Sequence, residues 1–200
     1  MRTFFKKIKQ AENKGFTMVE TIIAIFIFSV AITAIMAVFS KGIIGINYAK
    51  NEMIASYLAQ EGIEYIRNLR DDYIYYEGEN GWQSFLERLQ DAKCAVPGQG
   101  GCYFDDSHLN FGTSQGEMIQ NLFILPCDKE CPSLRYNSTN GRYNYDPNGA
   151  NSSFIRAIKV KFPNGMGGEG AIITSVVSFS GGGIAGEVSF SEDLYDLTQE

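Results

Sequence analysis

The pattern of hydrophobic and polar residues changes its period along the chain. Residues 16–39 form a nearly unbroken apolar run with one charged residue, Glu20, among aliphatic, aromatic and hydroxyl side chains. Apolar residues then recur at steps of three and four to about residue 70, which is the spacing of one face of an α-helix. The pattern therefore predicts one long helix over residues 17–70, about 80 Å long at about 1.5 Å per residue.

The second half of the chain follows the period of β-strands instead. A short amphipathic helix is predicted at residues 81–90, and residues 94–116 are predicted to be irregular. Alternation, or a short apolar run, predicts strands at residues 122–125, 133–136, 142–145, 154–162, 171–179 and 184–190. Short links rich in turn residues join these strands in direct succession, which favours an antiparallel meander.

One face of the predicted sheet needs an apolar cover. The stripe at residues 43–69 is the only long one available in the sequence. The sequence therefore predicts an α+β fold, with a long N-terminal helix packed on an antiparallel β-sheet head. The acidic pair Asp71-Asp72 is expected to end the helix, and the aromatic cluster at residues 73–76 to begin the head.

Three glycines lie inside the predicted helix, where each weakens it by about 1 kcal/mol relative to Ala. They are Gly42, Gly45 and Gly62. Two interpretations stay open. The glycines allow close packing or are simply tolerated, or the helix bends near Gly42 and Gly45 when it packs against a neighbour.

The apolar run has the length of a membrane span. As a helix its 24 residues are about 36 Å long, enough to cross a bilayer core of about 30 Å. Its hydroxyl groups can hydrogen-bond to their own helix; they belong to Thr17, Thr21, Ser29 and Thr33. The Glu20 carboxylate has no such partner and costs about 2–3 kcal/mol in a membrane. An amine is the nearest candidate partner, and cleavage after Gly15 would create one at Phe16.

Two ordinary explanations of the apolar run fit less well. A secretory signal has an apolar core of about 7–15 residues and is cut after it at an A-x-A-like site. This run is longer and contains no such site. A plain single-pass anchor fits the length but explains neither Gly15-Phe16 nor Glu20 at the boundary. Residues 1–15 hold five basic residues and one acidic residue, which places the N-terminus in the cytoplasm by the positive-inside rule.

The segment Gly15-Phe16-Thr17-Met18-Val19-Glu20, after basic residues and before a long apolar run, resembles the class III signal of type IV prepilins and type II secretion pseudopilins. The resemblance covers residues 1–70. It implies that a membrane aspartyl peptidase, prepilin peptidase, cuts between Gly15 and Phe16, and that Phe16 is N-methylated. It also implies that Glu20 pairs with the N-terminal amine of a neighbouring subunit during assembly, and that the fold is the ladle-like pilin fold.

The resemblance divides the chain into a leader at 1–15, a helix at 16–70 with its transmembrane segment at 16–39, and an extracytoplasmic head at 71–200. The partners it implies are prepilin peptidase, other pilin or pseudopilin subunits, an inner-membrane assembly platform and membrane lipid. Without the leader, 12 basic and 22 acidic residues remain, for a net charge of −10. Such a charge argues against direct nucleic-acid binding, which needs clustered Lys and Arg.

Four cysteines lie in the part that would be translocated. In an oxidising compartment an even number of cysteines indicates disulfides. Cys94 with Cys102 and Cys127 with Cys131 is the simplest of three pairings. A zinc site is the alternative, although the spacings lack paired C-x2-C knuckles. Many type IV pilins close a C-terminal loop with a disulfide, whereas the last 69 residues here contain no cysteine, so that loop must be held in another way.

Phosphate loops and the H-E-x-x-H and C-x-x-C motifs are absent from the sequence, and its one G-x-S-x-G pattern, at residues 112–116, lies in the segment predicted to be irregular and not in a strand–turn–helix context. We therefore expect no enzyme and no cofactor. Asp105-Asp106 and the segment from Asp146 to Gly149 offer oxygen ligands for calcium, as in some pseudopilin relatives. They lack an EF-hand spacing, and solvated loops are the alternative.

These features lead to one functional hypothesis and one alternative. The hypothesis is a structural subunit, a minor pilin or pseudopilin, of a type IV pilus, competence pilus or type II secretion pseudopilus. It would be a single-pass protein of the cytoplasmic membrane before it enters a cell-surface or periplasmic filament. The alternative is a membrane-anchored extracytoplasmic binding or adhesin domain that does not polymerise.

Overall fold

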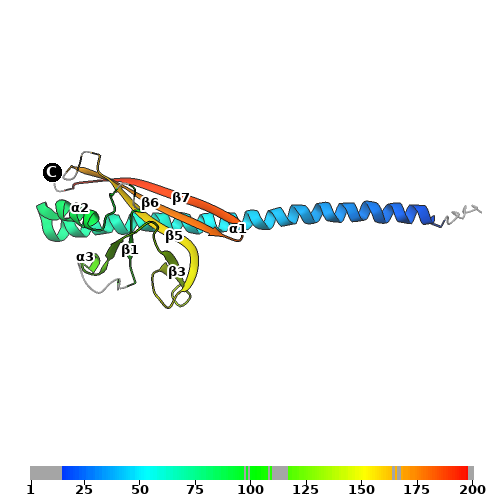
Figure 1. Cartoon of the computed structure of the whole chain (residues 1–200), viewed down its shortest axis with the longest axis horizontal. Coiled ribbons are helices and arrows are strands. Elements are labelled where there is room, and N and C mark those ends of the chain that lie inside the picture. Colours follow the sequence, from blue (N-terminus) through cyan, green and yellow to red (C-terminus); the bar gives the residue numbers. More distant parts are fainter. Residues whose placement is uncertain are drawn as a thin grey trace, which may run out of the picture. The chain divides into compact units, whose positions relative to one another are not determined.

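The structure is a computed structural model that describes residues 15–96, 98, 100–107, 109, 117–163, 165 and 168–197, with only the backbone at 117 and 118. The leader predicted at residues 1–15 lies outside this part of the chain, except for Gly15. The chain divides into two units, Met1–Gly45 and Ile46–Glu200. The first contains the beginning of helix α1 (Met18–Glu77), and the second contains the rest of α1 and the head (Figure 1).

Helix α1 ends seven residues later than the sequence predicted. The expectation that Asp71-Asp72 closes the helix is wrong, because Tyr73 continues its buried face. Tyr73 is buried, with its ring centroid 6.5 Å from that of Phe85. The α-helix stops before Gly78, whose φ of 59° lies in the left-handed region that favours glycine at helix ends. A short 3₁₀ turn, Gly78–Asn80, then leads into the next helix.

The predicted amphipathic helix is confirmed as α2 (Gly81–Asp91). Its apolar side chains, Trp82, Phe85, Leu86 and Leu89, are all buried. The indole Nε1 of Trp82 donates a hydrogen bond of 3.0 Å to the carbonyl oxygen of Gly168. Helix α2 therefore shares one core with α1 and the sheet.

In the described part of the chain seven strands form one antiparallel sheet, and six of them were predicted. They are β1 (Cys102–Asp105), β2 (Phe123–Pro126), β3 (Ser133–Asn137), β4 (Arg142–Asn144), β5 (Ala150–Lys161), β6 (Gly170–Gly181) and β7 (Ile184–Tyr195). A short helix, α3 (Glu117–Asn121), precedes β2. Strand β1 lies in the segment predicted to be irregular. That expectation is wrong at residues 102–105, where pairing with β2 and β5 stabilises a strand only four residues long.

The predicted meander is right for the three long strands and wrong for the short ones. Strand β5 pairs with β6, and β6 with β7 (Figure 1). The other edge of β5 is shared by β3, which pairs with residues 150–155, and β1, which pairs at Ile158. The hairpin β3–β4 forms as predicted, but it is β3 and not β4 that continues the sheet. Chain order therefore differs from spatial order on that side.

The core lies between α1 and the sheet, and it begins later along α1 than the stripe at 43–69 suggested. Ile43, Ile46 and Met53 are exposed, whereas burial starts around Ala55. From there α1 contributes Ala55, Leu58, Ala59, Ile63, Ile66 and Leu69 to two apolar clusters with β5, β6 and β7. The second half of the helix is thus the cover that the sheet needed.

Gly62 shows why one of the helical glycines is needed. A Cβ atom there would lie 3.1 Å from the Cβ of Ser175 and 3.2 Å from Cδ1 of Ile158, closer than side chains normally pack. The interpretation of close packing therefore holds for Gly62. Around Gly42 and Gly45 the described residues leave open space, and α1 continues through both.

Candidate functional site

The first turn of α1 positions the residues that the sequence singled out. Thr17 precedes the helix, and its Oγ1 accepts a hydrogen bond of 3.2 Å from the backbone N–H of Glu20. The segment Thr17-x-x-Glu20 therefore has the spacing of a capping box, a signal that the sequence contains and our prediction missed. Glu20 also lies in the first helical turn, where the helix dipole favours a negative charge. Part of the cost of this carboxylate is thus offset within its own helix.

The hydroxyl groups of the apolar run bond to their own helix, as predicted. Thr21 and Ser29 donate hydrogen bonds of 2.8 Å to the carbonyl oxygens of Met18 and Ile25. Thr33 donates to the carbonyl oxygen of Val30 at 2.9 Å. These bonds hide the polar groups from a surrounding apolar medium. Glu20 is left as the one charged side chain between residues 16 and 40.

The apolar run at the start of α1 is exposed throughout. Every described residue from 15 to 50 is exposed, including Phe26, Phe28 and Phe39 at 67–69%. Among the described helices, α1 is the one with the length and apolarity of a membrane span. A surface of this size is stable in water only if lipid or other helices cover it.

The bond between Gly15 and Phe16 lies outside the regular helix. Both residues are exposed and non-helical, and the Phe16 side chain is 80% exposed. A peptidase needs an accessible, extended backbone. The structure thus leaves this peptide bond available. Phe16, as a new N-terminus, would come four residues before Glu20.

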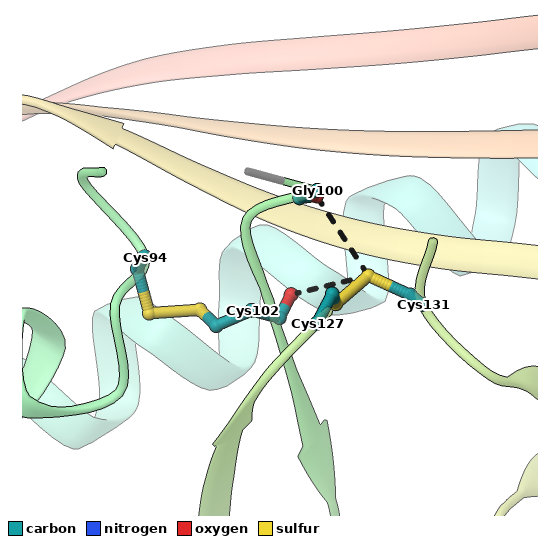
Figure 2. The surroundings of a disulfide bond; sticks show 5 residues. All are labelled: Cys94, Gly100, Cys102, Cys127 and Cys131. Carbon is teal, nitrogen blue, oxygen red and sulfur yellow. Dashed lines mark hydrogen bonds between the residues drawn. A yellow bond between two sulfur atoms is a disulfide. The ribbon is translucent and has the colours of Figure 1, made fainter. Parts of the chain in front are cut away.

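The four cysteines form the two local disulfides that were the simplest pairing. Cys94 is bonded to Cys102, which ties the end of α2 to β1, and Cys127 is bonded to Cys131, which closes the link from β2 to β3 (Figure 2). The Cys131 sulfur lies 3.8 Å from the carbonyl oxygen of Gly100 and 3.9 Å from that of Cys102. A disulfide sulfur has no proton to donate, so these are packing contacts that hold the two loops together.

The head contains a buried cation that sequence reasoning missed. Arg156 on β5 is 1% exposed, and its Nη1 lies 2.7 Å from Oε2 of Glu61 on α1. Its guanidinium carbon lies 4.0 Å from the centroid of the Phe104 ring on β1. A charge buried this deeply needs such partners. The alternation along β5 did place position 156 on the inward face, and that signal could have identified it.

A second polar cluster joins α1 to the loop after β1. The hydroxyl of Tyr65 donates a hydrogen bond of 2.8 Å to Oδ2 of Asp106, and Arg142 lies 3.2 Å from the same oxygen. Burial, followed by the Asp106 charge beside it, raises the pKa of Tyr65 above its usual value of 10.0. Asp106 is thus engaged by Tyr65 and Arg142. Asp146, the other calcium candidate, accepts hydrogen bonds from Asn137 and Asn148.

These features together define a class: an α+β domain whose covering helix begins with an exposed, membrane-length apolar segment. The N-terminal sequence defines this class more narrowly. Residues 11–36 match the family model described as the prokaryotic N-terminal methylation motif. This motif is the prepilin cleavage signal, so the chain carries the N-terminus of type IV pilin-like and pseudopilin proteins. No curated protein and no solved structure matches the chain.

Proposed function

We propose that this protein is a structural subunit, a minor pilin or pseudopilin, of a type IV pilus, competence pilus or type II secretion pseudopilus. The observation that carries the proposal is the methylation motif at residues 11–36, at the start of a helix whose apolar surface is exposed. The role is structural and not catalytic. The precursor would span the cytoplasmic membrane once, with its head outside the cytoplasm.

Processing prepares the subunit for assembly. Prepilin peptidase cuts between Gly15 and Phe16, and the new amino group of Phe16 is methylated. The apolar half of α1 then exchanges lipid for the helices of neighbouring subunits, guided by an assembly platform in the membrane. Support comes from the accessible Gly15–Phe16 bond and from the hydroxyl groups, which bond within their own helix and leave the apolar surface free to pack.

Glu20 directs the docking of one subunit against the next. In the membrane its carboxylate lacks a cation, and a neighbour's Phe16 amine supplies one. Loss of one partner of such a buried pair costs about 3–5 kcal/mol. The capping bond from the Glu20 backbone to Thr17 does not involve the carboxylate oxygens, so the charge remains available for a neighbour.

The test combines mass spectrometry with one matched pair of variants. The mature protein is expected to begin with N-methyl-Phe16; an intact leader in cells that contain the peptidase would instead favour a membrane-anchored binding domain that does not polymerise. Glu20→Gln is expected to reduce incorporation into filaments at least tenfold while the head stays folded. Thr21→Val, on the next position of the same helix, is the control and should assemble normally. Normal assembly of Glu20→Gln would contradict the role of this carboxylate.

A further inference from the structure

Strand β7 is an open edge of the sheet. All 12 of its residues pair with β6 in one unbroken register, and among the described strands no other pairs with it (Figure 1). Natural proteins protect such edges with bulges, prolines or charges. Strand β7 has neither a bulge nor a proline and carries three carboxylates and no basic residue. It is therefore long and regular enough to accept another strand.

The turn before β7 determines which of its backbone groups face outward. Gly182 and Gly183 have φ values of 60° and 79°, as in a type I′ turn, so Gly181 and Ile184 form a hydrogen-bonded pair. Hydrogen-bonded pairs then alternate along the strand. The bond from the N–H of Asp196 to the carbonyl oxygen of Glu169, 2.9 Å, continues this alternation. The N–H and C=O groups of residues 185, 187, 189, 191 and 193 consequently point to the open edge.

Three carboxylates lie beside this edge. Glu187 and Asp193 are exposed on the sheet face that points away from α1, six residues and thus about 20 Å apart. The third carboxylate, Glu192, lies on the other face, where Arg67 of α1 holds it with a hydrogen bond of 3.0 Å from its Nε. Two carboxylates that form no ion pair with the described residues, Glu187 and Asp193, therefore flank the middle of the edge.

A small pocket opens on the helix side of the same edge. It has a volume of about 170 Å³; its apolar lining residues are Ile63 of α1 and Phe190 of β7, and the others are polar, namely Gln60, Glu64, Arg67, Ser191 and Glu192. Phe190 is midway between Glu187 and Asp193 along the strand. In an added strand, side chains alternate between the two faces. One that lies opposite Phe190 would therefore point to this pocket, and the residues three positions before and after it would point to the two carboxylates.

We propose that β7 is an acceptor for an extended segment of another protein, with Lys or Arg at two positions six residues apart and an apolar residue midway between them. Backbone hydrogen bonds to the edge would supply affinity, and the pocket and carboxylates would supply selectivity. The pattern is symmetric about the apolar residue, so it fits a parallel or an antiparallel strand. The proposal does not depend on filament assembly.

A second copy of this chain is a poor occupant of the edge. Antiparallel pairing of two β7 strands centred on Phe190 would bring Glu187 of each copy next to Asp193 of the other, and like charges opposite one another destabilise a sheet. The sequence also lacks the required donor. Lys129 and Arg135 are its one pair of basic residues six apart, and Pro132 stands between them. The occupant is thus a different, basic polypeptide.

The test measures binding of a fluorescein-labelled peptide to the full mature chain in detergent micelles. The peptide has Lys at positions 1 and 7, Val at position 4 and Thr elsewhere, and the control peptide has Glu in place of both Lys residues. We expect the Lys peptide to bind at least tenfold more tightly than the Glu peptide. Hydrogen exchange should slow at the amides of residues 187, 189 and 191, and not at those of 188 and 190.

Variants separate edge pairing from simple charge attraction. Ser189→Pro removes one outward N–H without removing a bond to β6, and is expected to weaken binding at least tenfold, whereas Ser189→Ala should bind as before. The double change Glu187→Lys with Asp193→Lys should reverse the preference between the two peptides. Equal binding by Ser189→Pro, no binding of the Lys peptide, or self-association through β7 at the same protein concentration would each overturn the proposal.

Discussion

The two halves of helix α1 treat apolar and polar side chains in opposite ways. Before residue 46 the apolar side chains are exposed, and the hydroxyls of Thr21, Ser29, Thr33 and Ser40 bond to carbonyls three or four residues earlier. In the head half the apolar side chains are buried, and polar groups find partners far away in the sequence, such as Glu61 with Arg156. One helix thus exposes its apolar side chains along its first part and buries them against its own sheet along its second part.

This difference indicates which side chains stabilise the fold of the head and which are available to contact lipid or other proteins. A change in the first half should leave the isolated protein unaffected and alter what it inserts into or assembles with. A change in the second half should alter the stability of the head. Two sets of substitutions and one change of pH test this difference through the stability of the head, from the largest expected effect to the smallest.

Arg156→Ala should destabilise the head most. It removes a fully buried side chain packed on Phe104 and leaves a cavity, which for a large core side chain costs about 3–5 kcal/mol, while the partly exposed Glu61 carboxylate loses its cation. Denaturant unfolding of the mature chain in micelles, followed by near-ultraviolet circular dichroism, measures the free energy of unfolding. Arg67→Ala, in a half-exposed pair with Glu192, is the control and should cost no more than about 1 kcal/mol. Similar losses in the two variants would contradict the buried role of Arg156.

Substitutions of two isoleucines, one in each half of α1, allow the contributions of the halves to the unfolding free energy to be compared directly. Ile66→Ala should cost about 2–5 kcal/mol of unfolding free energy, because Ile66 is fully buried and its truncation leaves a cavity. Ile27→Ala, at a position that is 62% exposed, should leave the unfolding of the head unchanged. The same denaturant titration measures both. A loss at Ile27 comparable with that at Ile66 would show that the apolar half packs on the head after all.

Alkaline pH should weaken the head through Tyr65. Burial and the Asp106 charge raise the pKa of its hydroxyl above 10.0, so the unfolded chain loses this proton at a lower pH than the folded chain does. Stability is fully present below about pH 10 and falls as the pH rises toward the folded pKa. Denaturant midpoints measured from pH 8 to pH 11 test this. In Tyr65→Phe the decline above pH 10 should be shallower, and a decline of the same slope would assign the effect to other buried tyrosines, such as Tyr145.

The sequence predicted the elements whose signals are local. Periods of three to four residues identified both α1 and α2, and alternation identified the three long strands, since each pattern repeats over many residues. Strand β1 was missed because its four residues are stabilised by two neighbouring strands and not by a pattern of their own. The pairing of β3 with β5 was missed for the same reason, because pairing between distant segments produces no pattern in the local sequence.

The candidate sites divide in the same way. Gly15, Phe16 and Glu20 belong to a contiguous motif, so the sequence pointed to them directly, and their roles stay predictions. The local disulfide pairs also needed little knowledge of the fold. The bond between Tyr65 and Asp106, 41 residues apart, could not be predicted, because it exists only once α1 lies beside the loop after β1. The edge of β7 likewise became visible only with the order of the strands.

The buried guanidinium of Arg156 has a consequence for the order of folding. It joins a helix, a short strand and a long strand whose residues are up to 98 positions apart, Leu58 being the most distant. The Arg156 cation stays hydrated until α1, β1 and β5 have packed together. Because this packing closes a long loop, we expect it to be slow. Residues 71–200 expressed without the preceding helix would retain this charge with no counterion to receive it. We therefore expect residues 71–200 not to fold without the second half of α1, which supplies part of their core.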